Sequence, residues 1–167
     1  MNNFQVLMAI YCGLNMQAIQ RLRKTWKGVG KEHIALLKEL DQLFEAAENY
    51  KQYRTLLRAA IDENKPVLPF QGVYLKSLVF IEENHDRTER GLVNMEKLEM
   101  LYKVLNEIRM CLRFPYPFTE VPQIQDYLTN LEAMNDDELY KGSKQCEENT
   151  SETPNQLRKS VKLKKKI

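Results

Sequence analysis

The chain has 167 residues, enough for one domain with a sizeable core and too few for two ordinary domains. Apolar residues make up 43% and charged residues 29%, a globular composition in which the low counts of 6 Gly and 6 Pro favour helix. Of 25 basic and 23 acidic residues, six basic and three acidic ones lie in 147–167, which leaves 19 and 20 in 1–146. This near-neutral body argues against a nucleic-acid-binding core, which would carry a basic excess.

The three cysteines, Cys12, Cys111 and Cys146, are an odd number at wide spacing. This pattern argues against a disulfide framework and for a reducing compartment. No apolar run reaches the about 18 residues of a membrane-spanning helix, and the first residues lack the charged leader and apolar segment of a secretory signal. Together these features predict a cytoplasmic protein.

Apolar residues recur at helical spacing through the first part of the chain. They predict four helices before residue 65, at about 4–14, 19–26, 31–47 and 50–61. Asn2 or Asn3 can cap the first helix. Pro66 and Pro69 exclude helix through 65–69, because each lacks a donor and disfavours α geometry in the residue before it.

The next two segments predict an antiparallel helical hairpin, with arms at Val73–Glu83 and Leu92–Leu112 joined by a polar turn. Such a rigid hairpin suits the task of prying another structure open. In the second arm, apolar residues at alternating steps of three and four predict a seam that holds the helix to its own bundle: Leu98, Leu101, Leu105, Ile108 and Leu112.

Two more helices and a polar tail complete the prediction. Pro122 begins an amphipathic helix, and Asn135–Gln145 forms a last short one. Beyond Glu147 the apolar content collapses, so residues 148–167 are predicted to be a disordered basic tail. No convincing strand alternation is present. The predicted fold is therefore all-α, with a helical bundle in 1–147 from which the hairpin protrudes.

The sequence shows no constellation for bond-making chemistry. His33 and His85 belong to no HExxH or Cys/His metal pattern, and the glycine-rich phosphate-binding motifs are missing. Cys12 or Cys111 with a distant His could form a catalytic pair, but a buried helical cysteine is favoured. Adjacent carboxylates on a helix point about 100° apart, so the acidic pairs do not converge on a substrate. Neither a covalent enzyme nor a cofactor is predicted.

Short motifs occur along the chain in a characteristic order. They are Gly13-Leu14-Asn15, Arg21-Leu22, Thr25-Trp26, Asn49-Tyr50, Leu68-Pro69, Gly72-Val73-Tyr74-Leu75, Phe80-Ile81-Glu82-Glu83, Val93-Asn94-Met95 with Lys97, and Leu139-Tyr140. Each is weak alone, but over 3–147 the set closely resembles the catalytic domain of Ras-family guanine-nucleotide exchange factors, the domain shared with Son of Sevenless. The resemblance implies an all-helical fold with a protruding hairpin. The family domain begins upstream of the segment matching Asn3, so we expect this chain to hold its C-terminal portion.

The resemblance also implies that the hairpin displaces one switch of the GTPase and intrudes on its Mg²⁺ and phosphate sites. The wedge that crowds the metal falls on Val79, where well-known members carry a bulkier Leu, and the carboxylate that competes with phosphate falls on Glu83. The two are i and i+4 and share a helix face. The alternative is that Val79 belongs to the core and Glu83 is a solvated helix-end residue. Asn84 stands where the family commonly has Gly.

Further contacts follow from the same resemblance. Asn15 matches an Asn at the GTPase interface, or is a helix cap. Tyr50 matches a residue that meets the second switch of the GTPase, or is a half-buried tyrosine of the bundle. Lys76 and Phe80 are expected on the exposed side of the first arm, although Phe80 could instead pack on the second arm. The remaining predicted GTPase contacts are Asn49, Glu82 and His85.

The resemblance thus implies a module that promotes GDP release from a Ras-subfamily GTPase (Ras or Rap) by hairpin insertion, without a cofactor or covalent step. One alternative is a catalytically weak fragment that binds a GTPase or an adaptor. Another is an unrelated helical scaffold. The basic run Arg158–Lys166 is either a weak contact for anionic lipid at the inner face of a membrane or a solvated end.

Overall fold

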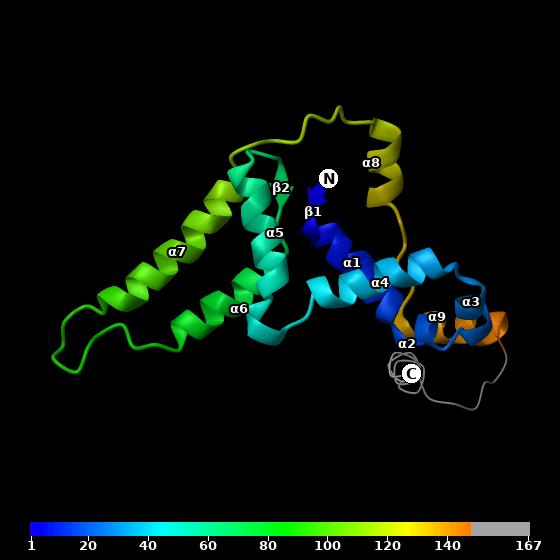
Figure 1. Ribbon diagram of the computed structural model, residues 1–167, viewed down its shortest axis with the longest axis horizontal. Coiled ribbons are helices and arrows are strands. Elements are labelled where there is room, and N and C mark those ends of the chain that lie inside the picture. Colours follow the sequence, from blue (N-terminus) through cyan, green and yellow to red (C-terminus); the bar gives the residue numbers. More distant parts are fainter. Residues whose placement is uncertain (148–167) are drawn as a thin grey trace. The chain divides into compact units, whose positions relative to one another are not determined.

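The computed structural model describes residues 1–147, and its mostly helical content confirms the predicted all-α class (Figure 1). The predicted tail, residues 148–167, lies outside the described residues. In chain order the elements are β1 Asn2–Asn3, α1 Phe4–Asn15, α2 Gln17–Gln20, α3 Arg23–Gly28, α4 Lys31–Leu43, the 3₁₀ turn η1 Ala47–Asn49, α5 Lys51–Asp62, β2 Val67–Leu68, α6 Gln71–Glu82, α7 Met95–Cys111, α8 Pro122–Thr129 and α9 Asp136–Cys146.

Several helix ends follow the predicted signals. The side-chain oxygen of Asn3 accepts a hydrogen bond from a backbone N–H of α1 at 2.9 Å, and Pro122 stands in the first turn of α8. Asn135 and Glu138 form a capping box at the start of α9. These ends are therefore set locally, by residues whose side chains satisfy backbone groups that lack partners within the helix.

Three boundaries differ from the prediction. The second predicted helix is split into α2 and α3, and α4 ends at Leu43 rather than near residue 47. The extended segment around Pro66 pairs in parallel with the N-terminus, Asn2 opposite Val67 and Asn3 opposite Leu68. This bridge corrects the expectation of no strand. Each of its strands has two residues, too few to show the alternation of apolar and polar residues that predicts a strand.

The chain forms two compact units, each described here by itself: residues 1–9 with 39–118, and residues 10–38 with the segment from 119 onward. Tyr53 and Leu57 of α5 are the centre of the first unit, and both are fully buried. The Tyr53 ring meets the Phe4 ring edge-on at 5.3 Å and lies 6.3 Å from Phe44, and its hydroxyl accepts from the Phe70 N–H at 2.8 Å. Burial raises the pKa of Tyr53 to about 12.

The predicted leucine seam of α7 is wrong at three of its five positions. Leu98, Leu105 and Leu112 are exposed, Leu105 to 50%, whereas Leu101 and Ile108 are half-buried. The inner face of the helix also carries polar residues with partners on other elements. Lys97 bonds the end of α6, and the Glu107 carboxylate, almost three turns further on, accepts from the Tyr74 hydroxyl and lies 3.8 Å from Arg54.

The cysteine prediction holds in part. Cys111 is buried, and burial raises the pKa of its thiol. Cys12 is exposed, so the expectation of a buried cysteine is wrong there, because α1 buries only Phe4 fully. Within residues 1–147 each cysteine is a free thiol, as predicted.

In the second unit, polar contacts hold α9 to the segment that joins α2 and α3. The Arg21 guanidinium donates to the carbonyl of Ser143 at 2.5 Å and lies over the Tyr140 ring. The Glu147 carboxylate accepts from the N–H groups of residues 24 and 25 at 3.1 and 2.7 Å, and from the Thr25 hydroxyl at 2.8 Å. Glu147 thus caps the N-terminus of α3 from the far end of the described chain.

We expect Leu57→Ala to lower the free energy of unfolding of the first unit by about 2–5 kcal/mol, because it leaves a cavity in a fully buried site. The neighbouring Leu56→Ala is a matched control, since Leu56 is exposed, and should change stability by less than about 0.5 kcal/mol. Urea unfolding followed by circular dichroism measures both. Equal losses in the two variants would contradict this description of the core.

We expect Glu147→Gln to destabilise the second unit at neutral pH and to lose this effect in acid. Burial acts to raise the pKa of the Glu147 carboxyl, but the hydrogen bonds from residues 25 and 24 outweigh it and hold the pKa below its ordinary value. A depressed pKa gives stability that is present above the unfolded value and is lost as pH falls through the folded value. Denaturation from pH 7 to 3 should show the two proteins converging below about pH 4.5. A pH-independent difference would disprove the capping role.

Candidate functional site

The helices α6 and α7 run in opposite directions, contact each other and are joined by residues 83–94 (Figure 1). The structure therefore contains the predicted hairpin. Its first arm, α6, begins at Gln71, directly after Phe70, which caps the helix and follows the extended segment around β2. A Cβ at Gly72 would clash with the Phe70 ring, so any larger residue at this position would force that ring to move.

Val79 and Glu83, the predicted wedge and phosphate competitor, lie one turn apart on α6. The Glu83 N–H donates to the Val79 carbonyl at 3.2 Å. Val79 is 63% exposed, so the alternative of a core residue is wrong. Glu83 is an exposed helix-end residue, as its alternative predicted, and no ion pair to its carboxylate is found within residues 1–147. An exposed apolar group and an exposed anion thus share one face.

A groove of about 460 Å³ lies between the end of η1 and the two hairpin arms. It brings together three predicted contact residues, Asn49, Lys76 and Phe80, with Met100 and Val104 of α7. Phe80 is 65% exposed, which argues against close packing on the second arm. The surface is apolar at its base and cationic at its rim.

Tyr50 stands beside this groove, half-buried, with the Lys76 ammonium 5.8 Å from its ring centre. It is the last of three successive residues in the left-handed region, after Glu48 and Asn49, with φ of 50°, 55° and 59°. This conformation is strained for residues other than glycine. Tyr50 is half-buried, as one of the two alternatives predicted. Its contact with a GTPase stays a prediction.

Arg54 holds the strained segment in place. Its guanidinium donates to the Asn49 carbonyl at 3.0 Å and to the Ser77 hydroxyl at 3.2 Å, and lies 3.8 Å from the Glu107 carboxylate. One side chain of α5 therefore joins the 48–50 turn to both hairpin arms. This strained turn was not predicted from the sequence. Asn49 was the only signal for it, since Asn tolerates this conformation.

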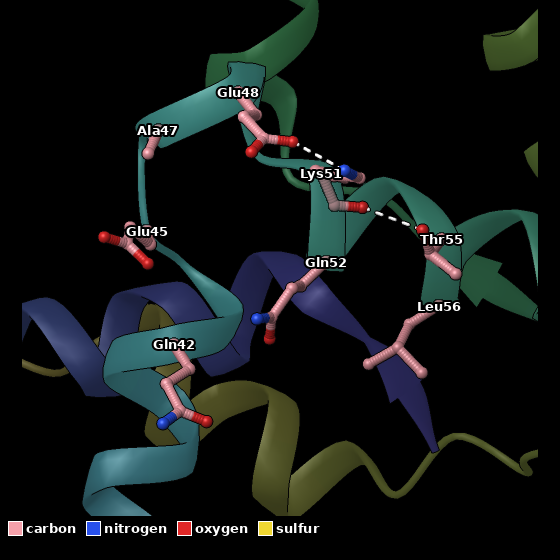
Figure 2. A pocket seen from close by; sticks show the side chains of 8 residues that line it. All are labelled: Gln42, Glu45, Ala47, Glu48, Lys51, Gln52, Thr55 and Leu56. Carbon is pink, nitrogen blue, oxygen red and sulfur yellow. Dashed lines mark hydrogen bonds and ion pairs between the residues drawn. The ribbon is translucent and has the colours of Figure 1, made fainter.

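A second pocket, of about 570 Å³, is lined by residues of α4, the 48–50 turn and α5 (Figure 2). It contains none of the predicted site residues. Figure 2 shows two contacts within it: the Lys51 ammonium lies 2.6 Å from the Glu48 carboxylate, and the Thr55 hydroxyl donates to the Lys51 carbonyl.

The connection between the arms is ordered by its own hydrogen bonds. The N–H of Thr88 donates to the Leu92 carbonyl and that of Gly91 to the Thr88 carbonyl, both at 2.8 Å. Gly91 has φ of 77°, which glycine adopts without strain. Of the predicted contacts, Glu82 and His85 are exposed at the start of this connection.

Asn15 belongs to the second unit. It is the last residue of α1, and its amide donates to the Tyr11 carbonyl at 2.8 Å. This is a local bond to the carbonyl four residues earlier in the same helix. Both alternatives for Asn15, the helix cap and the role at a GTPase interface, stay predictions.

No group of three or more His, Cys, Asp or Glu side chains among residues 1–147 is arranged to hold a metal ion. None of the helices in that range is both long and apolar enough to cross a membrane.

Comparison with known proteins identifies the family. Residues 1–99 match the RasGEF domain. The chain belongs to this family. It is 37% identical to Ras guanine nucleotide exchange factor Y of Dictyostelium discoideum over 145 residues, 86% of this chain and 9% of that protein. Identity to Ras-specific guanine nucleotide-releasing factor 2 of Danio rerio is 36% over 142 residues, 84% of this chain and 11% of that protein.

A third relative, Ras-specific guanine nucleotide-releasing factor 1 of Mus musculus, is 36% identical over 145 residues, 86% of this chain and 11% of the relative. This RasGEF chain thus spans about a tenth of the length of the relatives that it matches. The comparisons confirm the family that the motif order indicated.

Proposed function

We propose that this chain is a guanine-nucleotide exchange module for a Ras-subfamily GTPase (Ras or Rap), and that it promotes GDP release by inserting the α6–α7 hairpin. One observation carries the proposal. Val79 and Glu83 project side by side into solvent from an ordered hairpin, in a chain of the RasGEF family. The names of the relatives describe exchange and releasing factors for Ras, which supports the same function.

Each of the two residues has a distinct physical task in this proposal. A Mg²⁺ ion demands octahedral oxygen coordination and holds its waters tightly, so an apolar group pushed into its site removes coordination space. A carboxylate placed near the phosphates competes for the cationic and N–H groups that hold them. Val79 performs the first task and Glu83 the second. The metal and the nucleotide belong to the GTPase, and no covalent bond forms.

The rate enhancement comes from differential binding. A module that binds the nucleotide-free GTPase more tightly than the nucleotide-bound form weakens nucleotide binding by the same factor, because linkage is reciprocal. The groove between the 46–49 segment and the hairpin supplies part of that binding energy. Its exposed Phe80 accepts an apolar side chain of the second switch, while Lys76 and the Tyr50 ring frame it. Asn49, Glu82 and His85 complete the proposed contact surface.

A second function, a catalytically weak fragment that binds a GTPase or an adaptor, is favoured by one residue. Val79 is one methylene smaller than the Leu at this position in well-known members of the family, and a smaller wedge displaces less. Fluorescent-nucleotide release discriminates the two, because a binding fragment forms a complex without accelerating release. Cytoplasmic location, with membrane contact through Arg158–Lys166, stays a prediction.

Val79→Asp and Glu83→Ala should each slow nucleotide release by about tenfold or more, an activation free-energy loss of about 1.4 kcal/mol. The first removes apolar contact and places an anion at the wedge, and the second removes the phosphate competitor. Both side chains are exposed, so the unfolding midpoint should stay near the parental value. Release of a fluorescent GDP analogue is measured across a panel of Ras and Rap GTPases.

Leu56→Asp is the matched control, because it places the same charge at an exposed apolar position of α5 that does not line the groove. It should release nucleotide at the parental rate. Leu57→Ala should reduce folding and release together. If Val79→Asp and Glu83→Ala both release nucleotide at the parental rate, hairpin insertion is refuted. The second function, binding of a GTPase or an adaptor with little exchange, then becomes the leading one.

Phe80→Ala should raise the concentration of the chain needed for half-maximal release while leaving the maximal rate almost unchanged. Burying a phenylalanine contributes about 1.5–3 kcal/mol, so we expect an increase of roughly tenfold or more. Titration of the chain against a fixed GTPase separates the two parameters. An unchanged half-maximal concentration would exclude the groove from the interface.

A further inference from the structure

Lys97, in the first turn of α7, is a charged residue of which only 7% is exposed, and its ammonium reaches across to the end of the other arm. It donates to the Asp86 carboxylate at 2.6 Å, to the Asn84 carbonyl at 2.9 Å and to the Glu82 carbonyl at 3.5 Å. It also lies 3.4 Å from the Glu82 carboxylate. An ammonium has three donors, and all of them have acceptors here.

These acceptors lie where α6 ends. The last carbonyls of a helix lack helical partners and carry the negative end of its dipole, so a cation is favoured there. The hydrogen bond from Lys97 is the main cause that lowers the pKa of Asp86, and the bond to Asp86 is the main cause that raises the pKa of Lys97. Lys97 is therefore held in its charged form.

Asn94, one turn earlier, contacts the same stretch of backbone. Its side-chain amide donates to the His85 carbonyl and its N–H to the Asp86 carbonyl, both at 2.9 Å, while its side-chain oxygen accepts from the Lys97 N–H at 3.2 Å. Taken together, the carbonyls of residues 82, 84, 85 and 86 all accept from these two residues of α7. Glu83 lies within this run.

We propose that Lys97 is a positioning residue for the Glu83 carboxylate. The inference rests on the proposed function, in which that carboxylate must stay free to meet the GTPase. A side chain that has to remain without a partner cannot be oriented by contacts of its own. It is oriented through the backbone on either side, at Glu82 and Asn84, which the Lys97 ammonium ties to α7.

The alternative is that Lys97 contributes only a surface ion pair with Asp86, whose side chain is 84% exposed. Exposed pairs of this kind change equilibria by at most about fivefold. Asp86→Asn removes that pair and keeps the carbonyl contacts, so it isolates this contribution. The contacts to the two carbonyls are the ones that fix the position of Glu83.

The test compares Lys97→Met with Lys97→Arg and with Arg109→Met, a control further along α7 whose side chain is exposed and bonds only Asn106 among the described residues. The first readout is amide hydrogen exchange in the connection. Lys97→Met should speed exchange at residues 84, 88, 91 and 94 by about tenfold, because the carbonyls of Glu82 and Asn84 lose a charged donor. Exchange in α5 should not change.

The second readout is the maximal rate of nucleotide release, measured at a saturating concentration of the chain. For Lys97→Met we expect the maximal rate to fall by about tenfold to a hundredfold, as for a reacting group misplaced by about 1 Å. The half-maximal concentration should change little. Lys97→Arg should retain more activity than Lys97→Met, since it keeps a cation, and Asp86→Asn should lose at most about fivefold. Arg109→Met should match the parent in both readouts.

Parental release by Lys97→Met, or unchanged exchange in the connection, would overturn the proposal. An effect of Asp86→Asn as large as that of Lys97→Met would also overturn it, in favour of the surface ion pair. Should Lys97→Met unfold, Lys97→Gln, which is neutral and shorter, decides by the same measurements. A parent that releases no nucleotide from any GTPase would refute the proposed function, and the hydrogen-exchange comparison would then decide the positioning role.

Discussion

The hydroxyl of the fully buried Tyr53 accepts the N–H of Phe70, and this hydrogen bond fixes where α6 begins. Phe70 follows Pro69, so its N–H starts a helix that has no earlier turn to bond. The Tyr53 ring is itself held edge-on by Phe4. Since burial raises the pKa of Tyr53 to about 12, the hydroxyl stays neutral at physiological pH. The direction of the first hairpin arm therefore depends on the core of the first unit.

From that fixed origin, polar contacts hold both ends of the hairpin. Near its base, the Tyr74 hydroxyl donates to the Glu107 carboxylate at 3.0 Å, and burial raises the pKa of Tyr74 far above its usual range, so the proton stays on the tyrosine. Arg54 bonds both arms at the same level. At the other end Lys97 joins the arms. In the stretch between, Ile81 is buried while Val79 and Phe80 stay exposed.

The sequence predicted those features that are caused by residues within one segment, and failed at those that depend on contacts between segments. Helices whose caps and apolar spacing lie within one segment were predicted well. The seam of α7 was wrong in part, because a lysine in a helical first turn normally stays in solvent. The burial of Lys97 becomes favourable only through acceptors on the other side of the hairpin, which are the carbonyls of Glu82 and Asn84 and the carboxylates of Glu82 and Asp86. The left-handed turn at 48–50 depends on Arg54 in the next helix, which spacing cannot reveal.

The candidate site shows the same division. The resemblance placed Asn49, Lys76 and Phe80 near a common partner. The fold gathers them around one groove, although Asn49 lies 27 residues before Lys76. The roles of Val79, Glu83 and Asn15 came from the resemblance alone, since periodicity says nothing of a partner. Lys97 was noticed as part of a motif without a task, because its contacts exist only once the two arms meet.

The acidic end of α6 works against the stability of that helix. Glu82 and Glu83 place two carboxylates at the negative end of the helix dipole, where anions are unfavourable. Lys97 offsets this cost from the opposite arm, and it does so at the backbone, which leaves the Glu83 carboxylate exposed. Exposed Val79 and Phe80 likewise leave apolar surface in water, at about 25 cal/mol per Å². These sites are unfavourable in the free chain and become favourable against a partner that supplies cationic groups and apolar surface. A nucleotide-free GTPase supplies both in the proposed mechanism. By linkage, GDP binding is weakened by the part of this free energy that the GDP-bound form does not provide.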